Sequence, residues 1–79
     1  MKIGHFDRLE ELMSEAILEL RPLMSDQGAA DAQMYIEHDE FGVAWELLWF
    51  IVNNNNIIPP NSLLESGKMM GFDISQTSP

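Results

Sequence analysis

The chain has 79 residues, with thirteen acidic and four basic side chains, so its formal net charge at pH 7 is −9. A chain this negative repels nucleic acid and anionic membranes, and it attracts basic proteins. The absence of cysteine excludes disulfides and thiolate metal sites. A chain of this length has room for only one domain.

The N-terminal stretch MKIGHFDRLEEL has acidic residues from Asp7 onward and lacks the apolar region of a signal peptide. The most apolar run, from Val43 to Val52, is about half as long as the ~20 residues that a membrane-spanning helix requires. We therefore expect a cytoplasmic protein that does not bind membranes.

The first predicted element is an amphipathic helix from Phe6 to Leu20. Its apolar residues recur at spacings of three and four, which places them on one face of a helix. Pro22 ends the element, because the residue before a proline is disfavoured in helical geometry. The opposite face carries Asp7, Glu10, Glu11, Ser14, Glu15 and Glu19.

A second, weaker helix is predicted from about Ala29 to Glu37. Asp26 or Gly28 is expected near its start. Its periodicity indicates that Ala30 and Met34 face the interior, with Tyr35 as a further candidate.

A third helix is predicted from about Asp39 to Asn53, with Asp39 as its N-cap. It contains both tryptophans, and Glu46 is the only polar residue between Val43 and Val52. A helix that is apolar nearly all round must be buried on most sides, so this segment is predicted to be the centre of a bundle.

One narrow strip of this third helix is polar. Asp39, Glu46 and Asn53 are seven residues apart, close to two helical turns, and Gly42 lies in the same strip, which Val43 and Phe50 flank. The strip is either a surface that receives Lys and Arg side chains of a partner or the solvated edge of a buried helix. The glycine indicates either a close approach of another backbone or a loose first turn.

A fourth helix is predicted after Pro59 and Pro60, which cannot continue a helix but can begin one. Ser62 and Glu65 have the spacing of a capping box, and Gly71 is suited to a helix C-terminus. No segment alternates in polarity for long enough to form a strand. The predicted fold is all-α: a small single-domain bundle of about four helices around a central apolar helix, over residues 1–72. Residues 73–79 are predicted to be a disordered tail.

The sequence has no convincing catalytic, metal-binding or nucleic-acid-binding signature. His5 and His38 lie in different elements without the spacing of helical metal ligands, and no serine or cysteine nucleophile stands beside a base. The GK of ESGKMMG lacks the upstream glycine of a phosphate-binding loop. Four scattered cations cannot neutralise a phosphate backbone. We expect no enzymatic activity, no metal or other cofactor, and no direct binding of nucleic acid.

The segment EFGVAWE, residues 40–46, resembles a family of small bacterial immunity proteins, the MafI-like and contact-dependent growth inhibition (CDI) immunity proteins of polymorphic toxin systems. The family pattern is of the type E-[YF]-G-x-A-x-E, preceded by a short acidic helix and followed by an apolar helix and a turn. The organisation from about Leu9 to Met70 is similar to it. Trp45 stands where the family usually has an aliphatic residue.

The resemblance implies a non-catalytic protein that binds the toxin domain encoded beside it, often a nuclease, and neutralises it in the cytoplasm. Nucleases tend to be basic because they hold a polyanion, so an acidic inhibitor has complementary charge. Two other classes stay open: an acidic adaptor or structural module of a larger complex, and a modulator that mimics nucleic acid. The candidate partner-binding residues are Glu10, Glu11, Glu15, Glu37, Asp39, Glu40 and Glu46.

Overall fold

The computed structural model describes residues 5–72, with side chains from residue 8 onward. Within these residues the chain forms four α-helices and one short 3-10 helix, and it contains no strand. The elements are α1 (His5–Leu20), η1 (Arg21–Leu23), α2 (Asp26–Glu37), α3 (Phe41–Asn54) and α4 (Asn61–Met69). The predicted all-α bundle is confirmed, whereas the tail predicted at residues 73–79 lies outside the described residues.

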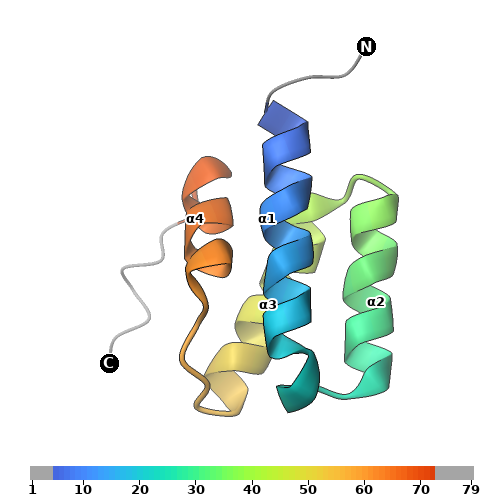
Figure 1. Cartoon of the computed structure of the whole chain (residues 1–79), viewed down its shortest axis with the longest axis vertical. Helices are drawn as coiled ribbons and strands as arrows, with labels where there is room; N and C mark the ends of the chain where they lie inside the picture. Colours follow the sequence, from blue (N-terminus) through green and yellow to red (C-terminus); the bar gives the residue numbers. More distant parts are fainter. Residues whose placement is uncertain (1–4, 73–79) are drawn as a thin grey trace.

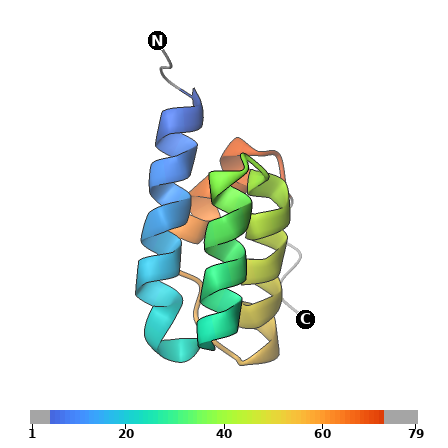
Figure 2. The same cartoon turned by 90° about the vertical axis from the view of Figure 1, so that its right-hand side faces the viewer.

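Successive helices run in opposite directions, so that α1 and α3 descend in Figure 1 while α2 and α4 ascend. Both α1 and α3 contact the three other helices. The remaining two, α2 and α4, pack on opposite sides of them, as the two views in Figures 1 and 2 show. The apolar helix α3 is therefore one of two inner helices, and it keeps one face towards solvent.

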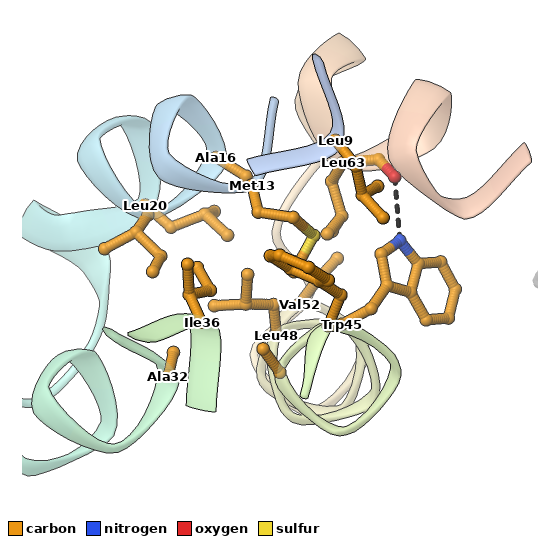
Figure 3. Packing of buried hydrophobic residues seen from close by; sticks show 13 residues of the cluster. Leu9, Met13, Ala16, Leu20, Ala32, Ile36, Trp45, Leu48, Val52 and Leu63 are labelled. Carbon is orange, nitrogen blue, oxygen red and sulfur yellow. Dashed lines mark hydrogen bonds between the residues drawn. The ribbon is translucent and has the colours of Figure 1, made fainter. Parts of the chain in front are cut away.

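The amphipathic pattern predicted for the first helix is confirmed in α1. Its apolar residues from Leu9 to Leu20 are buried, apart from Leu18, because they occupy the face that meets the other helices. Figure 3 shows how side chains of all four helices meet in one cluster. The labelled members are Leu9, Met13, Ala16, Leu20, Ala32, Ile36, Trp45, Leu48, Val52 and Leu63.

Helix α2 begins three residues earlier than predicted, because Ser25 is its N-cap. The Ser25 side-chain oxygen accepts a hydrogen bond from the backbone N–H of Gly28 at 3.0 Å, which satisfies one of the free donors of the first turn. The prediction that Ala30 and Met34 face inward is wrong, since both are exposed. The buried residues of α2 are Ala29, Ala32 and Ile36, and Tyr35, the third candidate, is half-buried against the core.

Asp39 ends α2 and does not cap α3, so the predicted N-cap is wrong. Its φ of 62° is left-handed, and its N–H donates to the Ile36 carbonyl at 3.0 Å. The Glu40 N–H donates to the Tyr35 carbonyl at 2.8 Å, which completes a Schellman motif. Helix α3 begins at Phe41, and its N-cap residue Glu40 makes no side-chain capping bond.

The start of α4 also differs from the prediction, whereas its end agrees with it. The capping box is wrong, because Ser62 lies inside the first turn and is buried, with no hydrogen-bond partner for Oγ within residues 5–72. At the other end, Gly71 has a φ of 83°. The Phe72 N–H donates to the Gly67 carbonyl at 2.9 Å, as in the motif that ends α2.

Trp45 connects α3 to α4. Its indole Nε1–H donates to the Leu63 carbonyl oxygen at 2.8 Å, the dashed line in Figure 3. Its ring stacks on Trp49 at 4.8 Å and on Phe72 at 4.5 Å between centroids. Gly67 lies against the same ring so closely that a Cβ atom there would stand 2.7 Å from Trp45 Cζ2. This contact fixes how near α4 approaches α3.

Candidate protein-binding surface

The outward face of α1 forms an acidic ridge, which we define as Glu10, Glu11, Glu15 and Glu19. All four side chains are exposed, because the buried residues of α1 occupy the opposite side of the helix. Leu18 lies on the same outward face and is 71% exposed. The outward face of α1 thus combines the four negative charges of the ridge with one apolar side chain that the core does not use.

The acidic ridge has little internal charge compensation. Arg8 contacts the Glu11 carboxylate at 3.1 Å and reaches Glu65 of α4 at 3.7 Å. Both contacts are exposed, and exposed ion pairs contribute roughly 0–1 kcal/mol. In the part of the chain that the structure describes, the remaining ridge residues form no ion pair. Their negative field therefore extends into solvent, where it acts on an approaching cation.

A second acidic group lies at the turn between α2 and α3. Glu37, Asp39 and Glu40 are all exposed there, near the end of the bundle where α1 begins (Figure 1). Glu37 occupies the last position of α2, where the partial negative charge of the helix terminus disfavours a carboxylate. Within residues 5–72 none of the three pairs with a cation, so this end of the molecule carries uncompensated charge.

The motif EFGVAWE divides between the core and the surface. Phe41, Ala44 and Trp45 are buried, so these positions serve the packing of α3. The residues Glu40, Val43 and Glu46 are exposed. The motif therefore supplies an outward surface as well as an inward one.

The polar strip predicted along the third helix is only partly correct. Glu46 and Asn53 are exposed, but Gly42 is half-buried beside Phe72. A Cβ at Gly42 would meet only the Phe72 ring, at 3.8 Å, so no backbone approaches there, and the glycine lies in the first turn of the helix.

The seven candidate residues do not form one patch. Glu10, Glu11 and Glu15 lie on the outward face of α1, and Glu46 lies on the outward face of α3. Because α1 and α3 turn their buried faces towards each other, these two outward faces point in different directions. Glu37, Asp39 and Glu40 occupy the turn between α2 and α3. A partner that contacts all of them would have to wrap around one end of the bundle.

Exposed apolar residues lie beside these acids. Val43 is 45% exposed and Phe50 is 62% exposed, on the outward side of α3. The sequence placed both of them at the flanks of the polar strip, on the side of the helix away from its broad apolar face. Sequence reasoning missed Leu18, although a helical wheel of residues 6–20 places it among the acids.

Residues 5–72 contain no group of three or more His, Cys, Asp or Glu side chains that could hold a metal ion. In the same residues no helix is both long and apolar enough to cross a membrane. Comparison with known proteins found no matching family model, curated protein or solved structure.

Proposed function

We propose that this chain is an immunity protein, which binds a basic bacterial toxin domain and neutralises it by protein–protein contact. The observation that carries the proposal is the charge of the surface. All seven candidate acids are exposed, and of these seven only Glu11 pairs with a cation within the described residues. The resemblance of residues 40–46 to small immunity proteins supports the same function. The protein would act in the cytoplasm of the cell that makes the toxin.

Charge acts first on the rate of binding. A net charge of −9 on 79 residues raises the local concentration of a basic partner and can accelerate encounter by roughly 10–1,000-fold. This effect weakens as salt screens the field, with a Debye length of about 8 Å at physiological ionic strength. A nuclease domain that holds a polyanion is the kind of partner on which such a field acts most strongly.

Apolar contacts are then needed to hold the complex, because exposed ion pairs alone contribute little. Interfaces draw most of their affinity from a few buried apolar or aromatic side chains, surrounded by polar contacts that exclude water. Leu18 is placed to supply such an apolar contact, since it is exposed beside the carboxylates of the acidic ridge on the outward face of α1. The toxin would be neutralised by occlusion of its surface, without chemistry by this chain.

The test is an affinity purification of the tagged chain from its native cells, at low and then at high salt, with mass spectrometry of the retained proteins. We expect one stoichiometric partner with a basic domain, and its purified domain should be toxic or nucleolytic alone and inactive in the complex. A multi-subunit assembly of non-toxic proteins, or no partner at either salt concentration, would contradict the proposal.

A further inference from the structure

Four residues on the solvent side of α3 form what we call the outer α3 face: Val43, Glu46, Leu47 and Phe50. They are spaced at i, i+3, i+4 and i+7, so they form a stripe about 10 Å long on the helix surface. Val43 and Phe50 are exposed at its two ends; halfway along, the half-buried Leu47 lies at one edge and the exposed Glu46 at the other. The stripe is thus apolar, with one carboxylate at its edge.

Of this stripe, the fold uses only the half-buried Leu47. Helix α3 packs on its neighbours through Phe41, Ala44, Trp45, Leu48 and Val52, which are its buried residues. Half-buried Leu47 and Trp49 adjoin the core on the two sides of the outer face, so apolar surface continues past its edges. Contiguous exposed apolar surface edged by polar groups is typical of a binding site.

We infer that the outer α3 face docks an amphipathic helix of a basic partner, with a Lys or Arg of that helix opposite Glu46. A straight stripe with helical spacing fits a second helix, whose own apolar side chains recur at the same intervals. The inference rests on the proposed function, since the docked helix would belong to the toxin domain. It adds which surface holds that domain after charge has guided it there.

Charge complementarity favours this occupant over a second copy of the chain. Two copies would each bring a net charge of −9, and a symmetric pair of α3 helices would place the two Glu46 carboxylates near each other. Within residues 5–72, Glu46 has no cation to pair with. A basic helix supplies that cation while it covers Val43 and Phe50.

The experiment uses two synthetic helical peptides of about 18 residues as probes, long enough to be helical in water. Both carry leucines at i, i+3, i+4 and i+7. One has lysines on the flanks of this stripe, and the matched peptide has glutamates there. Each is titrated into the isotopically labelled chain, and the backbone amide resonances are followed by NMR. We expect the lysine peptide to shift residues 43–50 and to bind at least about tenfold more tightly than the glutamate peptide.

Three variants distinguish peptide binding at the outer α3 face from binding elsewhere on the surface. Phe50→Ser should weaken binding of the lysine peptide about tenfold, and Glu46→Lys should reverse the preference between the two peptides. Leu23→Ser is the matched control, because it removes a similarly exposed apolar side chain, 57% exposed against 62% for Phe50, from η1 and should leave binding unchanged. All three positions are exposed, so the variants should fold.

Shifts centred on α1, equal losses for Phe50→Ser and Leu23→Ser, or no binding of the lysine peptide would overturn the inference. So would concentration-dependent shifts of residues 43–50 without peptide, which would make a second copy of the chain the occupant. The peptides contain no toxin, so these outcomes are independent of the affinity purification. If the peptide binds at α3 but the affinity purification recovers no toxic partner, only the proposed function is contradicted.

Discussion

Replacement of Gly67 by alanine has two opposite effects on the stability of the fold. In a helix interior, alanine is favoured over glycine by about 1 kcal/mol, and Gly67 lies within α4. A Cβ at this position, however, would stand 2.7 Å from Cζ2 and 2.9 Å from Cε2 of Trp45. Real Cβ atoms do not approach so closely, so either the indole ring or α4 must move.

The indole ring has little freedom to move. Its Nε1–H is bonded to the Leu63 carbonyl at 2.8 Å, and it stacks on Trp49 and Phe72. Overpacking of a tight core costs about 1–3 kcal/mol, and a contact this short belongs in the upper half of that range. After the gain in helix propensity, Gly67→Ala should lower the free energy of unfolding by about 1–2 kcal/mol, and the thermal midpoint by roughly 5–15 °C.

Urea unfolding followed by tryptophan fluorescence measures this change. Gly42→Ala is the matched control, because a Cβ there would meet only the Phe72 ring at an ordinary 3.8 Å. The control should raise the free energy of unfolding by up to about 1 kcal/mol. A Gly67→Ala variant as stable as the unmodified chain, or more stable, would refute the account of how α4 packs on Trp45.

Asp39→Gly should raise the free energy of unfolding by about 0.5–1 kcal/mol in the same assay. It relieves a left-handed conformation and removes a carboxylate from the C-terminus of α2. A lower free energy of unfolding would contradict the Schellman geometry. Ser62→Ala should leave stability unchanged or raise it by up to about 1 kcal/mol, since Oγ is buried with no partner within residues 5–72; a loss would indicate a capping bond. Reversal of Glu10, Glu11 and Glu15 to lysine changes the net charge from −9 to −3 and should slow association with the toxin domain about tenfold at low salt, with a flatter salt dependence in stopped-flow measurements. Unchanged kinetics would refute the steering role of the acidic ridge.

Much of the fold could be predicted from local pattern. The spacing of apolar residues identified α1 and its buried face, because one face of that helix is apolar and the other is acidic. Pro22 and Gly71 marked helix ends through constraints on φ that act within the chain itself. All-helical architecture followed from the absence of period-two alternation.

The errors share one physical origin: the residues concerned suit more than one local structure, and the sequence pattern alone does not decide between them. Asp39 suits an N-cap, but as the left-handed residue after α2 it closes a Schellman motif through backbone bonds to the Ile36 and Tyr35 carbonyls. Ser62 has capping-box spacing, yet Pro60 fixes the start of α4 two residues earlier and the hydroxyl becomes buried. Ala29 and Ala32 of α2 face inward while Ala30 is exposed, a choice that depends on how α2 packs on its neighbours.

The charge of the candidate surface was predictable, and its apolar part was predictable for Val43 and Phe50 but was missed for Leu18. Every candidate acid is exposed, as expected for carboxylates in a small helical domain. The division of these acids between α1, the turn and α3 depends on how the helices are arranged, which one sequence does not specify. The open side of α3 likewise depends on where α2 and α4 pack against it.

The most direct test of the central claim is protection of cells. The partner domain recovered by the affinity purification is expressed as the proposed toxin domain under an inducible promoter in a laboratory bacterium, alone and together with the chain, and growth is recorded. The proposed function predicts arrest with the toxin domain alone and normal growth when both are present, with a one-to-one complex recovered from the protected cells. Equal arrest in both cultures, while the chain is folded and abundant, would contradict it.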